Sequence, residues 1–198
     1  MMDKLLDILK LPTSLLLQGR EYAINADFRP CVNIMRMFER TDLSDAEKID
    51  CMVEIFYKDE IPDRLRTEAA QKAVWFLNLG EAPAGRVKGN QGGRLFSWEQ
   101  DLKFIISAAD KAAGFSIRSK EFYHFWEFMS AFFESGECVF NTLVHQRKLK
   151  RTGKQTKADK EWWAENKDIA ELKIELSSDE QEILDTFNKL LEGGEASD

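Results

Sequence analysis

The chain has few of the residues from which metal centres and disulfide-bonded folds are built. It contains three cysteines and two histidines in 198 residues. Cys31, Cys51 and Cys138 lie far apart, form no CxxC pair and leave one thiol unpaired in any disulfide scheme. A structural zinc site needs four ligands at short, characteristic spacings. We therefore expect no metal and no cofactor, and free, mostly buried thiols in a reducing cytoplasm.

Long hydrophobic runs are also missing. The longest apolar runs span three to five residues, whereas a membrane-spanning helix needs about 20. The N-terminal MMDKLLDILK carries acidic residues, and its apolar run is too short for a signal peptide. These patterns predict a protein that stays in the cytoplasm of the cell that makes it.

Motifs that would support catalysis are absent from the sequence. Neither histidine lies near a GxSxG-type nucleophile elbow. Residues 80–94, GEAPAGRVKGNQGGR, hold five glycines and a proline, but they lack the Lys-Ser/Thr pair and the strand–helix setting of a phosphate-binding loop. No pair of carboxylates stands out. We expect a flexible surface loop at about residues 80–94 and no enzymatic activity.

Charge is plentiful and unevenly distributed. The net charge of −7 argues against affinity of the whole protein for nucleic acid. Residues 147–160 nevertheless hold seven basic residues and one acid, and residues 161–198 hold three lysines and twelve acids. The basic strip could bind phosphates while nearby aromatic rings stack on bases; its candidate residues are Lys148, Lys150, Arg151, Trp162 and Trp163. The alternative is a solvated connector, neutralised by the acidic segment that follows it.

The hydrophobic patterns predict a mostly α-helical fold with one β-hairpin. In residues 11–24, two short extended runs flank Gln18-Gly19. Gly19 can supply the positive φ of a two-residue hairpin turn. Helix-capping signals then follow in order: Asp27, Ser44 with Glu47, Pro62 before a helix that Gly80 ends, Ser97 with Gln100 before a helix that Gly114 ends, and Ser178 with Gln181. We expect a single helical domain over residues 1–176, followed by an acidic C-terminal helix and tail over residues 177–198.

One stretch, EFYHFWEFMSAFF at residues 121–133, is mostly aromatic. On a helix, most of its large apolar side chains share an arc of about 160°, and His124 falls on the opposite, polar face. Glutamates rather than basic residues flank the rings, so a buried helix face is favoured over a base-stacking platform. Because the arc is wider than the usual stripe, Phe128 or Phe132 at its edge could remain exposed to a partner.

The order of several short motifs resembles the bacteriophage "gene product fifteen" family. The opening LPTSLLLQGREYAINADFR is similar to the family's Leu-Pro-Thr-Ser start, Gly-Lys/Arg-Glu-Tyr turn and Ile-Asn-x-Asp-Phe-Arg signature. The resemblance continues through LSDAEKID, Ile61-Pro62, Trp75-Phe76, the glycine-rich break and the basic strip, and covers roughly residues 11–172. Arg118 departs from it, since relatives often carry a capping Thr there, and the acidic helix after Leu176 extends beyond the usual end.

This resemblance implies a phage or prophage protein of tail morphogenesis. Family genes typically lie between those of the major tail protein and the tape-measure protein, which is the usual place for tail assembly chaperones. Such a chaperone would bind and solubilise the helical tape-measure protein in the host cytoplasm, would self-associate, and would be absent from the mature virion. The major tail protein is a further possible partner. A structural tail or connector component is the first alternative, and a nucleic-acid-binding protein is the second.

The C-terminal segment supplies the last candidate partner-binding residues. Apolar side chains recur there at helical spacing, as on an amphipathic helix: Leu184, Phe187 and Leu191. A helix of this kind can bind in an apolar groove of another protein, or can offer its own apolar face to one.

Overall fold

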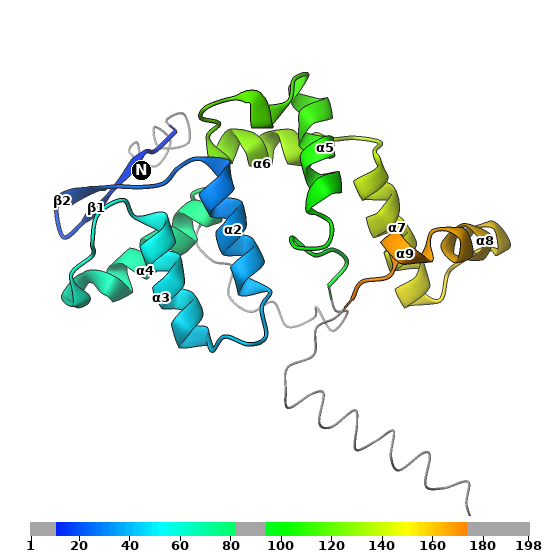
Figure 1. The fold of residues 1–198 in the computed structure, drawn as a ribbon, viewed down its shortest axis with the longest axis horizontal. Coiled ribbons are helices and arrows are strands. Elements are labelled where there is room, and N and C mark those ends of the chain that lie inside the picture. Colours follow the sequence, from blue (N-terminus) through cyan, green and yellow to red (C-terminus); the bar gives the residue numbers. More distant parts are fainter. Residues whose placement is uncertain (1–10, 82–93, 174–198) are drawn as a thin grey trace, which may run out of the picture.

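The computed structural model describes residues 11–81 and 94–173, and over these residues the protein is mostly α-helical (Figure 1). Two strands form one antiparallel sheet: β1 (Ser14–Leu17) and β2 (Arg20–Ala23). The helices are α2 (Phe28–Phe38), α3 (Asp45–Phe56), α4 (Arg66–Leu77), α5 (Leu102–Ala113), α6 (Phe125–Phe133), α7 (Val139–Thr152), α8 (Lys157–Glu165) and α9 (Lys167–Ala170). Single 3₁₀ turns span Asp63–Leu65 and Ile117–Ser119. The predicted fold class is therefore confirmed.

The hairpin follows directly from its turn residues. Gln18 has a φ of 47° and Gly19 a φ of 80°, the two positive angles that a type I′ turn requires. The strands pair in a register that sets Leu15 opposite Tyr22. Leu15 and Leu17 are buried and Leu16 is 60% exposed, so the sheet has one buried face that packs on the helices.

The helix starts match the capping signals in the N-terminal half of the chain. Asp27 caps α2 by accepting a hydrogen bond from Arg29 N at 2.9 Å. Ser44 and Glu47 form the expected reciprocal capping box of α3. Both interactions satisfy amide groups that have no partner within the helix.

One predicted helix start is wrong, and one predicted helix end is confirmed with a second left-handed residue before it. Ser97 Oγ accepts hydrogen bonds from the amides of Glu99 and Gln100, but these belong to a turn, and α5 begins five residues later at Leu102. After α4, the first residue in the left-handed region is Leu79, with a φ of 58°, and Gly80 follows with a φ of 83°. The Gly80 amide then donates to Trp75 O at 2.9 Å, which closes the helix end.

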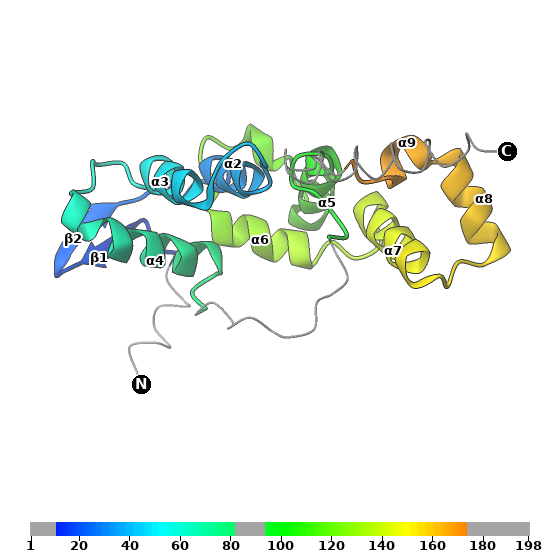
Figure 2. The same cartoon turned by 90° about the horizontal axis from the view of Figure 1, so that it is seen from below.

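The core lies between two layers of helices. Figure 2 shows α2 and α3 on one side and α4 and α6 on the other, with α5 beside them. Tilted and stacked rings from these helices fill the space, for example Phe56 against Phe76 and Phe28 against Phe128, each with ring centroids 5.1 Å apart. Helices α7, α8 and α9 lie at the end of the molecule farthest from the hairpin (Figure 2).

Candidate protein-binding surface

The residues of the N-terminal signature form a structural junction rather than a binding site. Asn25 Nδ2 donates to Ile55 O at 2.7 Å. Asp27 Oδ2 accepts from the Tyr123 amide at 2.9 Å while Oδ1 caps α2. Arg29 Nη2 donates to Lys120 O at 2.7 Å. The motif therefore joins the start of α2 to the segment that leads into α6.

His124 is part of the same junction, and its predicted place on a polar helix face is wrong. Helix α6 begins one residue later, at Phe125, and His124 is its N-cap with 1% exposure. Nδ1 accepts from the Trp126 amide at 3.1 Å, and Nε2 donates to Pro12 O at 3.0 Å. These contacts select the neutral tautomer that carries its proton on Nε2. Burial accordingly lowers the pKa of His124.

The interpretation of the aromatic stretch as mainly core is confirmed, but the predicted exposed edge is wrong. Phe128 is fully buried and Phe132 is 8% exposed. Phe28 of α2 stacks on Phe128, and Phe140 of α7 packs on Phe132 with centroids 5.0 Å apart. Neighbouring helices thus cover this edge of the arc. Phe133, at the end of α6, is the exposed ring of this helix at 63%.

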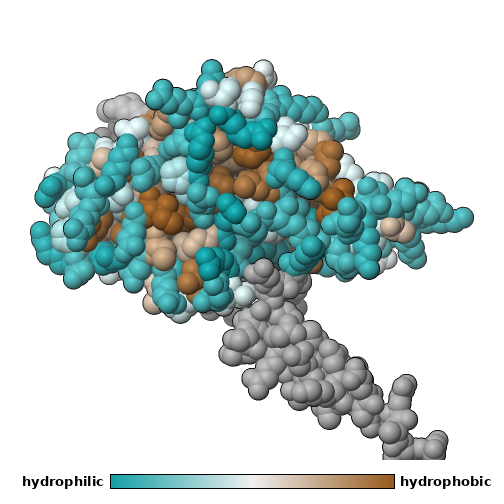
Figure 3. Space-filling view, in the orientation of Figure 1, coloured by the Kyte–Doolittle hydropathy of each residue, from teal (hydrophilic) through white to brown (hydrophobic). Residues whose placement is uncertain are grey.

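Apolar side chains reach the surface at several points over the described residues. On the face in Figure 3, brown apolar areas lie along the middle of the molecule and are bordered by teal polar residues. The large exposed ones are Leu11, Leu16, Phe38, Ile49, Phe115, Phe122, Phe133 and Val139. They are scattered over several elements, so exposure alone does not define a binding site.

A shallow groove lies along α6. Its volume is about 550 Å³, and it is lined by Leu11, Leu79, Ala112, Tyr123, Trp126, Glu127, Ser130, Ala131 and Glu134. Trp126 Nε1 donates to Phe76 O at 2.9 Å, which fixes the indole ring that forms part of the floor. Glu127 and Ser130 of α6 are exposed, and so is Glu134, the C-cap of this helix. The groove is thus apolar at its base and acidic at its edge.

Sequence reasoning missed Glu127 and Glu134 as candidate site residues. Along the chain they stand out only as polar neighbours of the aromatic rings. Their spacing of seven residues, close to two helical turns, was the available signal that both lie on one face. What the sequence could not supply was the apolar floor, since Leu11, Leu79 and Ala112 come from three distant segments.

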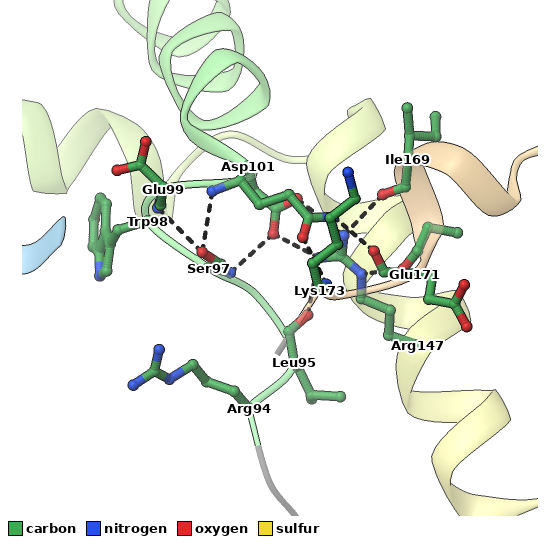
Figure 4. A network of polar contacts seen from close by, with 12 residues as sticks. Arg94, Leu95, Ser97, Trp98, Glu99, Asp101, Arg147, Ile169, Glu171 and Lys173 are labelled. Carbon is green, nitrogen blue, oxygen red and sulfur yellow. Dashed lines mark hydrogen bonds and ion pairs between the residues drawn. The ribbon is translucent and has the colours of Figure 1, made fainter. Parts of the chain in front are cut away.

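The basic strip does not form one solvated face, because Arg147 is buried. It pairs with Asp101 through two hydrogen bonds, Nη1 to Oδ2 at 2.6 Å and Nη2 to Oδ1 at 2.9 Å (Figure 4). Its remaining N–H groups donate to the carbonyls of Leu95, Ile169 and Ala170. The guanidinium therefore ties the segment before α5 to α7 and α9.

Hydrogen bonds from the Gln100 side chain hold the chain that follows α9. Gln100 Nε2 donates to Glu171 O at 2.7 Å, and Gln100 Oε1 accepts from the Lys173 amide at 2.9 Å. The side-chain amide thereby pairs with the backbone as a strand would. The polar network in Figure 4 is structural, since its groups bind one another and the backbone.

The other residues of the strip do remain near the surface. Lys148, Lys150 and Arg151 are exposed at the end of α7. Trp162 and Trp163 of α8 are half-buried, and Lys150 Nζ lies 3.9 Å from the centre of the Trp163 ring. A cation thus already covers one ring that was predicted to stack on bases. The candidates Leu184, Phe187 and Leu191, like the predicted segment 177–198 and most of the loop at 80–94, lie outside the described residues.

The described ranges contain no cluster of three or more His, Cys, Asp or Glu side chains that could hold a metal ion. The cysteines are free: Cys31 is buried, and Cys51 and Cys138 are half-buried. Burial raises the pKa of the Cys31 thiol well above its ordinary value. Among residues 11–81 and 94–173, no helix has the length and apolar character to cross a membrane.

Comparison with known proteins gives one positive result. Neither the curated proteins nor the solved structures yield a match. The sequence model of the family described as Bacteriophage Gp15 protein matches residues 8–172, which includes the N-terminal hairpin, the α6 groove and the buried Arg147 network. The chain belongs to the Bacteriophage Gp15 protein family.

Proposed function

We propose that this phage protein is a tail assembly chaperone that binds and solubilises the tape-measure protein during tail morphogenesis. The observation that carries the proposal is the family match over residues 8–172, together with the genomic position that the family resemblance implies. The protein acts in the cytoplasm of the bacterial host as a non-catalytic binding module and leaves before the virion is complete. Several copies cover each client, so self-association is part of the proposal.

The surface of the protein supports this function. A long helical client exposes apolar stripes, and the hydrophobic effect favours aggregation of the client through these stripes. Helix α6 offers an open apolar groove, a form of surface that takes amphipathic helices. The net charge of −7 keeps a complex with an apolar client dispersed.

Co-expression tests the proposal. The tape-measure protein of the same phage should become soluble and co-purify with the full chain. A soluble protein of similar size and charge serves as the control for expression level. An insoluble client and an empty affinity eluate would refute the chaperone function.

Purified virions separate this proposal from the first alternative. Mass spectrometry of mature particles should detect the tape-measure protein and the major tail protein but not this protein. A stoichiometric signal from this protein would identify a structural tail or connector component instead.

A further inference from the structure

Two carboxylates follow the exposed side of α6: Glu127 lies within the helix and Glu134 is its C-cap. Glu127 and Glu134 stand seven residues apart and line the same groove. Seven residues of α-helix advance about 10.5 Å and nearly two full turns. Both carboxylates therefore border the groove from the same side, with Ser130 and Ala131 between them.

The floor of the groove is apolar and partly accessible. It combines Trp126, which is 8% exposed, with Leu11, which is 45% exposed, and with Leu79 and Ala112. The small side chains of Ser130 and Ala131 allow another helix to approach α6 closely, within the 8–10 Å between axes that packed helices show. The shape and the apolar floor suit one face of an amphipathic helix.

The charge of the groove selects among such helices. Within residues 11–81 and 94–173, neither Glu127 nor Glu134 takes part in an ion pair. With no cation of the described residues paired to them, the two carboxylates attract a basic partner and repel an acidic one. The same charge disfavours phosphate and the chain's own acidic residues 177–198.

We propose that the α6 groove binds an amphipathic helix whose apolar stripe is flanked by Lys or Arg residues seven positions apart. The apolar stripe lies on Trp126 and Leu79, and the two cations pair with Glu127 and Glu134. This inference rests on the proposed chaperone function, in which the bound helix is a segment of the tape-measure protein. It adds the site and the recognition chemistry.

Two synthetic peptides probe the groove directly. Both have about 20 residues, which is long enough to populate a helix, and the same apolar stripe. One carries lysines at two flanking positions seven residues apart, and the other carries glutamates there. Fluorescence anisotropy with the full chain should show binding of the lysine peptide that is about tenfold tighter, the sum of two partly exposed charge pairs.

Charge reversal in the protein should invert this preference. The Glu127→Lys/Glu134→Lys variant should bind the glutamate peptide more tightly than the lysine peptide. Glu60→Lys/Glu165→Lys changes the net charge equally at exposed positions outside the groove, and should keep the original order of affinities. Equal affinity of the two peptides for the unmodified chain, or the same loss in both variants, would overturn the proposal.

Two further outcomes have distinct meanings. If the unmodified chain solubilises the tape-measure protein and the groove variant does so equally well, the groove inference fails and the chaperone function stands. If the peptides swap as expected but the client is never solubilised, the groove inference stands and the chaperone function fails. If the lysine peptide binds only to a chain that lacks residues 1–10, the chain's own N-terminus is the occupant of the groove. That result would overturn the proposal of an external partner.

Discussion

Replacing Arg147 by Met should destabilise the protein far more than the loss of a surface ion pair. Arg147 is 5% exposed and Asp101 is fully buried. Arg147→Met leaves the Asp101 carboxylate with the Ser97 amide, at 3.0 Å, as its remaining donor. The carbonyls of Leu95, Ile169 and Ala170 lose their partner as well. Breaking one side of a buried pair costs about 3–5 kcal/mol, a large part of the about 5–15 kcal/mol that stabilises a typical domain.

Urea unfolding followed by circular dichroism measures this loss. Arg36→Met is the matched control, because Arg36 forms a two-bond ion pair with Glu99, at 2.5 and 2.8 Å, on the surface. The side chains of Arg36 and Glu99 are 35% and 62% exposed, so this pair should contribute less than about 1 kcal/mol. Equal losses in the two variants would refute the reasoning that burial determines the contribution.

A double variant and hydrogen exchange locate the effect. Asp101→Leu/Arg147→Met removes the isolated buried charge, so its loss should be smaller than the sum of the two single losses. In Arg147→Met, amide protection should fall most in α9 and in residues 95–101, which the guanidinium joins. Uniform loss of protection across the hairpin and α3 would contradict this local role.

Three further predictions concern other parts of the molecule. Gly80→Ala should lower the free energy of unfolding by about 1–2 kcal/mol more than Gly114→Ala does, as measured by thermal unfolding. Both glycines have positive φ, but a Cβ on Gly80 would lie 3.2 Å from the Trp126 ring, whereas a Cβ on Gly114 would meet open space. Equal losses would contradict the close contact at Gly80. The folded-state pKa of His124 lies below its ordinary value of 6.5. In acid the His124 side chain therefore binds protons more readily in the unfolded chain than in the folded one. The stability present above pH 6.5 is lost as the pH falls through the folded-state pKa. His124→Asn, which keeps a capping side chain, should flatten this pH dependence, and an unchanged slope would assign it to other groups. Removal of residues 177–198 should increase binding of the chain to DNA at low salt, and Lys148→Gln/Lys150→Gln/Arg151→Gln should abolish the increase; unchanged DNA binding after the removal would refute pairing between the acidic segment and the basic strip.

The parts of the fold that sequence predicted are those that short-range interactions determine. The hairpin depends on two adjacent residues with positive φ, Gln18 and Gly19. The capping box at Ser44 and Glu47 spans a single helical turn. Patterns of this length can be read along the chain without knowledge of what packs on the element.

The errors arise where a distant segment decides the outcome. His124 was expected on a polar helix face, but the Pro12 carbonyl, more than 100 residues away, binds its ring. Composition places Arg147 in a basic strip that either binds phosphate or is solvated, but its side chain pairs with the buried Asp101 carboxylate, 46 residues away. The width of the arc leaves Phe128 or Phe132 as a candidate for exposure, but α2 and α7 cover them. Periodicity gives the face of a helix and not its neighbours.

The junction between Asp27 and Tyr123 has a consequence for synthesis of the chain. These residues are separated by 96 positions, and the start of α2 forms a backbone bridge to the start of α6. At a translation rate of about 5–20 residues per second, the second half of this junction follows the first by roughly 5–20 s. During that interval the nascent hairpin and α2 lack their Tyr123 and His124 partners. The hairpin and α2 can therefore complete these contacts only after the start of α6 has been synthesised.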